Sequence, residues 1–384
     1  MNCEEICLDD RFRVFQVNHL KIPFVKRVGL DLAAKYMLLL MNSFGKRSKN
    51  SNVFVDEVKN NSMVTNMRNT MKHFGEREES FCVCNFRERE KEFPHVKIGY
   101  TNAAMLFLAF SIQYCIVLAF SLLFARRKVK RKMAELLVNY MRKYVRVVEQ
   151  GKANVQFYMM TDHNFFSTIV ALSAKGKTLV IQHGLILDRS YYYPILADEF
   201  LAWGEESKKK LEGDSKVKVT GTYKFDLYAK APENDDGSIL YCVSILDNKL
   251  VKKKIDNLLK ITKEAGLGFK VKTHPGSFYN VQVWKDMYAG ENIQFFQEES
   301  LLDIPFHTAV IENSTILLDM LYLKKNIIIY DSADGYFGQY AGIVPCSESY
   351  EGIKEALSKG RCEDFESTEQ IIMEKELFGG QCTI

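Results

Sequence analysis

The chain has 384 residues and lacks the patterns that mark a metal site. It has no Asp-x-Asp triplet, and no histidines and cysteines stand at the spacing of a zinc site. Its nine cysteines are scattered, and Cys82 and Cys84 are too close together for a Cys-x-x-Cys clamp. We expect reduced, partly buried thiols. We expect no cofactor and a metal-independent chemistry, in which side chains and a helix dipole replace the cation; magnesium is the alternative, although nothing in the sequence requires it.

A cleavable signal peptide and a low-complexity tract are also missing. The N-terminal residues include Glu4, Glu5, Asp9 and Asp10, whereas a signal peptide begins with basic residues. Apolar residues make up 47% of the chain and charged residues 26%, which is typical of a globular protein long enough for two domains. We therefore expect the domains to stay in the cytoplasm.

Short apolar runs alternate with helical patterns along the second half of the chain. Strands are predicted at residues 239–244, 269–273, 293–296, 308–311 and 326–330. Helices are predicted at residues 249–264, with Gly266 as the stop signal, and at residues 314–325. Strands that alternate with helices at this spacing form parallel β-α-β units, so this half is predicted to be Rossmann-like.

The first half carries a similar but less regular pattern. Strands are predicted at residues 81–85, 155–160, 178–181, 196–203 and 217–221, and helices at 30–41 and 165–174. Residues 46–80 are polar and are predicted to form a loop-bearing segment. We place the domain boundary near Thr222, which gives domains of residues 1–221 and 222–384. The predicted fold class is α/β, with two Rossmann-like domains that face a cleft.

Polar motifs follow three of the predicted strands, at the carboxyl end where open α/β sheets bind ligands. They are Gln182-His183-Gly184, Lys272-Thr273-His274-Pro275 and Glu312-Asn313-Ser314-Thr315. The hydroxyls of Ser314 and Thr315, the start of their helix and the His274 imidazole could together hold a phosphate. The alternative is that Ser314 only caps its helix and that His274 and Pro275 form an ordinary turn.

The order of these motifs resembles the bacterial surface-polysaccharide transferases of the GT-B fold, over about residues 155–360. That group includes sialyltransferases and polysialyltransferases, Kdo transferases and the glycerophosphotransferases that use CDP-glycerol. The resemblance implies that His274, with Pro275, and the pair Ser314 and Thr315 bind the phosphate of the donor nucleotide. It also implies that Asp319 lies near the nucleotide ribose, although Asp319 could equally be a solvated helix residue.

An inverting transferase needs a base to deprotonate the acceptor hydroxyl. The resemblance to the glycerophosphotransferases implies His183 for this role, with Gln182 and Gly184 as acceptor or loop residues. Sialyltransferases use an acidic residue, which makes Asp162 the second choice, as a base or as the group that orients His163. The alternative is that His183 contacts backbone and only shapes its loop.

Residues 98–125 contain no charged side chain, and the basic run Arg126-Arg-Lys-Val-Lys-Arg-Lys132 follows at once. Without these six basic residues the formal charge of +4 becomes −2, so the basicity is local. This favours an anionic membrane surface as a partner and argues against nucleic acid. We favour a monotopic or re-entrant helix pair within residues 98–148, with residues 133–148 as a basic amphipathic helix on the membrane. The alternatives are a membrane span and a buried core helix.

Taken together, the sequence predicts a glycosyltransferase of surface-polysaccharide synthesis on the cytoplasmic side of the inner membrane. Its donor would be a nucleotide-activated sugar, CMP-linked, and its acceptor a glycan or a lipid-linked glycan. A CDP-polyol phosphotransferase could use the same phosphate residues. A non-catalytic scaffold of a polysaccharide assembly complex is the alternative from another class, and a nucleotide-sugar epimerase would share the fold.

Overall fold

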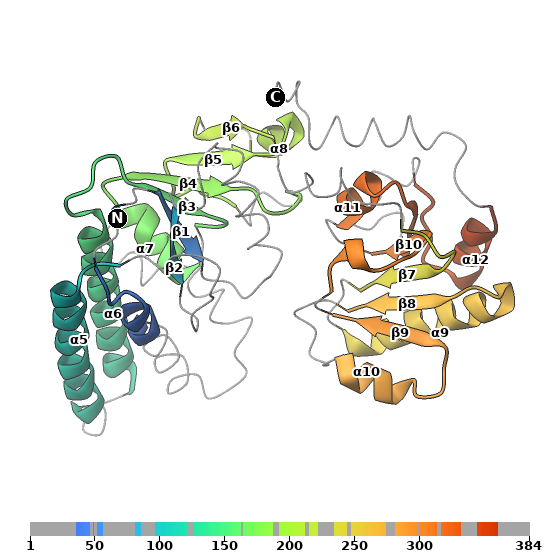
Figure 1. The fold of residues 1–384 in the computed structure, drawn as a ribbon, viewed down its shortest axis with the longest axis horizontal. Coiled ribbons are helices and arrows are strands. Elements are labelled where there is room, and N and C mark those ends of the chain that lie inside the picture. The colour runs from blue at the N-terminus through green and yellow to red at the C-terminus, as the bar shows by residue number, and fades with distance from the viewer. Residues whose placement is uncertain are drawn as a thin grey trace.

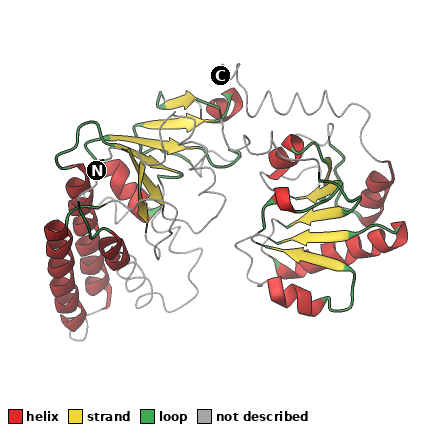
Figure 2. Ribbon diagram, in the orientation of Figure 1, coloured by secondary structure: helices red, strands yellow, loops and turns green. Residues whose placement is uncertain are grey.

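Two separate β-sheets organise the chain in the computed structural model (Figure 1). The structure describes residues 36–46, 49, 52–56, 81–85, 97–120, 126–162, 164–186, 192–211, 215–221, 234–243, 247–273, 281–297, 299–312, 316–331 and 344–359. Every strand pair among these residues is parallel. Because parallel neighbours need crossover connections, strands alternate with helices along much of the chain, as the sequence predicts (Figure 2).

The first sheet has the strand order β2-β1-β3-β4-β5-β6. Its strands are β1 (Asn52–Asp56), β2 (Phe81–Asn85), β3 (Gln156–Met159), β4 (Lys177–Ile181), β5 (Glu199–Ala202) and β6 (Val217–Val219). Its helices are α5 (Tyr100–Phe120), α6 (Arg126–Glu149), α7 (Phe165–Ser173) and α8 (Glu205–Lys210), and residues 36–42 form a further helical segment.

The second sheet has the strand order β11-β10-β7-β8-β9. Its strands are β7 (Ile239–Cys242), β8 (Phe269–Lys272), β9 (Ile293–Phe296), β10 (Thr308–Ile311) and β11 (Asn326–Ile329). Its helices are α9 (Asn248–Ala265), α10 (Val281–Met287), the 3₁₀ turn η4 (Leu301–Asp303), α11 (Ile316–Tyr322) and α12 (Tyr350–Lys359). Thr222, the predicted boundary, falls between β6 and β7 and outside the described residues.

Helices cover both faces of the second sheet, because its strands are apolar on both sides. Residues alternate between the faces along each strand. In β7, Ile239 and Tyr241 join one buried cluster with α9, α10 and α12, whereas Leu240 and Cys242 join another with α11 and η4. This doubly covered sheet is the arrangement that the alternating pattern predicts.

Helix α9 shows how local sequence sets the bounds of an element. The carboxylate of Asp247 caps its start by accepting hydrogen bonds from the backbone N–H groups of Lys249 (2.9 Å) and Leu250 (3.4 Å). Gly266 ends it in the left-handed conformation, at φ +66°. Such a conformation favours glycine, so the predicted stop signal is confirmed.

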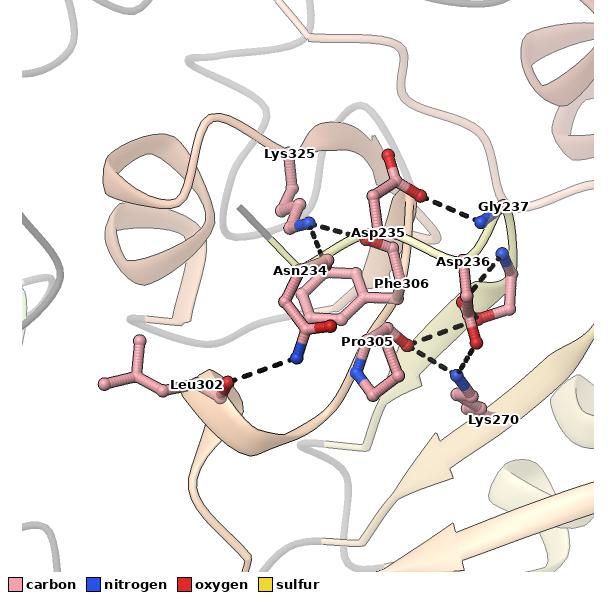
Figure 3. A network of polar contacts seen from close by, with 10 residues as sticks. Asn234, Asp235, Asp236, Gly237, Lys270, Leu302, Pro305, Phe306 and Lys325 are labelled. Atoms are coloured by element: carbon pink, nitrogen blue, oxygen red, sulfur yellow. Dashed lines mark hydrogen bonds and ion pairs between the residues drawn. The ribbon is translucent and has the colours of Figure 1, made fainter. Parts of the chain in front are cut away.

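A polar network joins the amino-terminal ends of β7, β8, β10 and β11 (Figure 3). The buried ammonium of Lys325 donates to the backbone carbonyls of Asn234 (2.6 Å) and Phe306 (2.7 Å). The ammonium of Lys270 pairs with Asp236 and donates to the carbonyl of Pro305 at 2.6 Å. This edge of the sheet is therefore closed by its own side chains.

Two sequence expectations need correction. Residues 46–80 were expected to be loop-bearing, but β1 lies within them and pairs with both β2 and β3. Its apolar run is only Val53-Phe54-Val55, between polar residues, and is too short to stand out. The second correction concerns α6. Its apolar side was expected on a membrane surface, whereas Tyr140, Tyr144 and Val148 lie in the core of the first sheet.

Helix α5 lies beside α6 and is buried on one side only (Figure 1). Ala103, Leu106 and Phe110 face the core, and the Phe110 ring contacts that of Tyr36, with centroids 4.7 Å apart. Its opposite side is exposed at Met105, Leu108, Ile112 and Ile116. The buried-helix alternative thus holds for only one side of α5. Among the described residues, no helix combines the length and apolar character needed to cross a membrane.

Candidate functional site

The strand order of the second sheet creates a topological switch point between β7 and β10. The chain proceeds from β7 to β8 and β9 on one side, then crosses back to β10 and β11 on the other. In open α/β sheets of this kind, ligands bind outside the carboxyl ends of the strands at such a point. The motif that follows β10 begins there, and the motif that follows β8 leaves the same edge one strand away.

The structure describes some of the predicted site residues and not others. His163, His274, Pro275, Ser314 and Thr315 lie outside the described residues. The described ones are Asp162, Gln182, His183, Gly184 and Asp319.

Asp319 is buried in α11 and is not a solvated helix residue. Its carboxylate acts on the thiol of Cys242 at the carboxyl end of β7. Burial raises the pKa of Cys242 to about 12, and the carboxylates of Asp319 and Glu312 add to that rise against the opposing ammonium of Lys272. The charges of Asp319, Glu312 and Lys272 therefore all influence the Cys242 thiol, at the carboxyl edge of the second sheet.

His183 follows β4, and its ring leans toward the end of β3. Its Nδ1 lies 2.8 Å from the backbone carbonyl oxygen of Met160. Because a carbonyl only accepts hydrogen bonds, Nδ1 must carry the proton, and the neutral ring then has its lone pair on Nε2. His183 can thus contact backbone through Nδ1 and still act as a base through Nε2. Its side chain is partly exposed.

The first sheet has its own switch point, between β1 and β3, because β2 lies beyond β1 and the later strands lie beyond β3. The Met160 carbonyl that binds His183 directly follows β3. The ring of Tyr192 lies near that of His183, with centroids 6.1 Å apart, and burial raises the pKa of Tyr192 to about 12. Tyr192 therefore stays protonated at neutral pH.

Asp162 is buried, and backbone groups occupy its carboxylate. Its Oδ2 accepts hydrogen bonds from the N–H groups of Leu196 (2.6 Å) and Ala197 (3.0 Å). Its own carbonyl accepts a bond from the Thr168 hydroxyl at 2.7 Å. These contacts anchor the segment that leads into β5, and they leave His183 better suited than Asp162 to accept a substrate proton.

Gln182 and Gly184 build the loop that carries His183. The Gln182 side chain is buried, accepts from the Trp203 backbone N–H at 2.7 Å, and donates to the Gly184 carbonyl at 2.8 Å and to the Ser207 hydroxyl at 2.9 Å. Of the two predicted roles, acceptor or loop residue, these bonds fit the loop residue.

A buried charged cluster at the same edge of the second sheet escaped the sequence analysis. The Glu312 carboxylate is fully buried, lies 2.8 Å from the Lys254 ammonium, and accepts a 2.5 Å hydrogen bond from the Tyr241 hydroxyl. Lys254 also donates to the Tyr330 carbonyl at 2.7 Å. The signal was present, because Lys254 lies three residues after Val251, on the apolar side of α9.

Among the residues that the structure describes, no three histidine, cysteine, aspartate or glutamate side chains are placed to hold a metal ion. Among the described residues, the two carboxyl edges carry an imidazole, buried carboxylates and an ammonium group.

No protein-family model matches the chain, and no curated protein matches it. Solved structures do. A Listeria monocytogenes protein assigned as a UDP-N-acetylglucosamine 2-epimerase has a TM-score of 0.51 at 11% identity, over 86% of this chain and 92% of that one. The UDP-GlcNAc 2-epimerase of Neisseria meningitidis bound to UDP-GlcNAc has a TM-score of 0.49 at 14% identity, over 84% and 98%.

The wall teichoic acid polymerase TagF has a TM-score of 0.45 at 12% identity, over 97% of this chain and 94% of that one. The Listeria monocytogenes structure has a TM-score above 0.5, and at its low identity it shows the fold alone. The two parallel sheets with their flanking helices are consistent with the two Rossmann-like domains of the GT-B fold, which nucleotide-sugar enzymes share.

Proposed function

We propose that this chain is a membrane-associated glycosyltransferase that transfers a sugar from a nucleotide-activated donor, CMP-linked, to a glycan or lipid-linked glycan. The transfer inverts the configuration at the anomeric carbon of the sugar and uses no metal. The fold, which nucleotide-sugar enzymes share, and the chemistry of His183 support this proposal. The donor would lie between domains of residues 1–221 and 222–384.

The donor phosphate is assigned to His274, with Pro275, and to Ser314 and Thr315. The support is topological. Strands β8 and β10 are both parallel to β7, which lies between them, so both strands end at the same edge of the sheet, β10 beside the switch point and β8 one strand away. Asp319 acts on the end of β7 and is assigned to the ribose side of the nucleotide.

The base is assigned to His183, and its bond to the Met160 carbonyl is the observation that carries the proposal. With the proton on Nδ1, Nε2 can accept the proton of the acceptor hydroxyl. The acceptor oxygen then forms a bond to the anomeric carbon while the bond from that carbon to the phosphate oxygen breaks. The nucleotide leaves with the electron pair, and the phosphate residues stabilise its charge.

A thermal-shift panel of CMP, CDP, UDP, GDP and ADP tests the donor assignment. A nucleotide at a hundred times its dissociation constant should stabilise the protein by about 2.7 kcal/mol. Selective stabilisation by CMP is the expected result. Preference for CDP would favour the polyol phosphotransferase, and no stabilisation by any of the five would favour the non-catalytic scaffold.

Two histidine variants then separate binding from chemistry. His274→Ala should weaken CMP binding in calorimetry, whereas His307→Ala should not, because His307 pairs with Asp235 at the opposite edge of the second sheet, at 2.7 Å. His183→Ala should leave CMP affinity unchanged and lower turnover by about 10²-fold or more. Equal losses of affinity and turnover would make His183 a binding residue.

The membrane part of the proposal rests on α5. Its exposed side chains Met105, Leu108, Ile112 and Ile116 recur every three or four residues, which places them along one side of the helix. The basic run that opens α6 follows closely in the sequence. An apolar stripe next to a basic segment suits an anionic bilayer surface, such as the cytoplasmic face of the inner membrane.

A further inference from the structure

Trp203 and Gln182 bind each other twice, through different groups. The Trp203 backbone N–H donates to the Gln182 side-chain oxygen, and the indole Nε1–H donates to the Gln182 backbone carbonyl, both at 2.7 Å. Both residues are buried, with 2% and 1% of their surface exposed. An indole N–H usually finds a partner when it is buried, and here that partner is the peptide group that leads into His183.

These two hydrogen bonds fix the start of the His183 loop. The Gln182 carbonyl belongs to the peptide bond that joins Gln182 to His183, so the indole sets the orientation of that peptide. The Gln182 amide meanwhile holds the Gly184 carbonyl on the other side of His183. The backbone on both sides of His183 is therefore restrained, and the ring donates from Nδ1 to the Met160 carbonyl.

Trp203 also belongs to a buried apolar cluster that includes residues of the second half of the protein. Trp203 and Leu185, which flank this network, belong to the same buried cluster as Leu240, Ile311 and Leu317 of the second sheet and its helix α11. Apolar burial and the hydrogen bond to Gln182 therefore both restrict the indole. A side chain fixed by packing and by hydrogen bonds can position a reacting group closely.

We propose that Trp203 is a positioning residue for His183: through the Gln182 carbonyl it keeps His183 as the Nδ1–H tautomer, with Nε2 as the basic nitrogen. The catalytic use of that tautomer rests on the proposed function. The tautomer itself does not, because it is inferred from the hydrogen bond between His183 Nδ1 and the Met160 carbonyl.

The test is ¹⁵N NMR of the histidine ring nitrogens in protein labelled at histidine, with His183 assigned by the loss of its signals in His183→Gln. In the unmodified protein His183 should show a protonated Nδ1 and an unprotonated Nε2. A proton on Nε2 would overturn the proposal before any variant is made.

Trp203→Phe keeps an aromatic ring but removes the indole donor. We expect a substantial fraction of His183 in this variant to carry its proton on Nε2. Trp284→Phe is the matched control, because Trp284 is buried in α10, within the cluster that covers the other face of the second sheet, and should leave the His183 signals unchanged. An unchanged tautomer in Trp203→Phe would overturn the proposal.

If Trp203→Phe does not fold, Ser207→Ala gives a milder perturbation of the Gln182 side chain that Trp203 binds, since it removes one of the two acceptors of the Gln182 amide. It should shift the His183 signals in the same direction, and unchanged signals would overturn the proposal. With a CMP-activated sugar, Trp203→Phe should lower kcat by about 10-fold or more while KM changes little. The proposed function fails separately, if CMP does not bind in calorimetry whatever the tautomer.

Discussion

Among individual residues, Glu312 places a buried carboxylate at the carboxyl edge of the second sheet. Its side chain is 1% exposed and pairs with Lys254, which is itself mostly buried. A buried pair adds little net stability over apolar residues, but the removal of one partner leaves a buried charge without compensation. Burial and the nearby Glu312 carboxylate also raise the pKa of Tyr241 well above its usual value, so its hydroxyl remains a donor to that carboxylate.

Glu312→Ala should therefore lower the free energy of unfolding by about 3–5 kcal/mol, measured by urea denaturation. Lys252→Ala is the control, because its pair with Asp256 is exposed and should cost at most about 1 kcal/mol. The double variant Glu312→Met with Lys254→Met should lose less than the two single losses added together. Similar losses for Glu312→Ala and Lys252→Ala would contradict the assigned role.

Residues that follow predicted strands were found from the sequence because apolar runs mark where strands end. Gln182, His183 and Asp162 are of this kind, and the structure places them at carboxyl ends of the first sheet. The partners of these residues were not predicted. Trp203 lies 21 positions from Gln182, and no local pattern joins the two. The catalytic and phosphate roles stay predictions.

Among the elements, α5 combines a buried side with an apolar side that is exposed. Contiguous apolar surface of this kind is unusual on a protein in water. Leu108 is 61% exposed and Ile112 is 52% exposed. Side chains of this kind gain free energy when they enter the boundary between lipid headgroups and acyl chains. The exposed side of α5 is therefore the place to test membrane binding.

The double variant Leu108→Ser with Ile112→Ser should bind anionic vesicles at least about 10-fold more weakly, because each apolar side chain contributes about 1.5–3 kcal/mol when fully buried. Vesicle sedimentation with anionic and neutral lipids measures this. Leu250→Ser with Leu267→Ser is the control, since both residues are exposed in or next to α9 of the second half. Equal binding by wild type and both variants would remove α5 as the contact.

Most elements of the second sheet follow from the sequence, since their apolar runs are buried on both faces. In β10 all four residues are buried, and the prediction of residues 308–311 has the observed bounds. Strand β1 was missed because its neighbours lie far away in sequence: Asn52 pairs with Phe81 on one side and Gln156 on the other. Pairing of that range is set by tertiary packing, which no local window contains.

At the scale of the whole molecule, the two edges of the second sheet differ in character. The amino-terminal edge is closed by the network of Lys325, Lys270 and Asp236. There, burial opposes ionisation of Asp236, yet its hydrogen bonds with Lys270 and Ser238 outweigh this and lower its pKa. The carboxyl edge carries the motifs. We expect stability to depend on the first edge and ligand binding on the second.

Lys325→Met tests this division. It removes two hydrogen bonds from a buried ammonium, each worth about 1.5–3 kcal/mol at most, and should lower the thermal unfolding temperature clearly. CMP affinity, measured by calorimetry well below that temperature, should stay within about twofold of wild type, far less than the tenfold that 1.4 kcal/mol produces. A large loss of affinity with unchanged stability would contradict the division.

The parallel pairing of both sheets has a consequence for how the chain folds. No hairpin occurs among the described strands, so no pair of neighbours can form from a short local loop. The central strands of the two sheets pair residues that are far apart in sequence, such as Asn52 with Gln156 and Ile239 with Thr308. Chains with such high contact order fold slowly, and their apolar strands stay exposed to one another meanwhile. The yield of active protein should then depend on temperature and chaperones during synthesis more than on the stability of the finished fold.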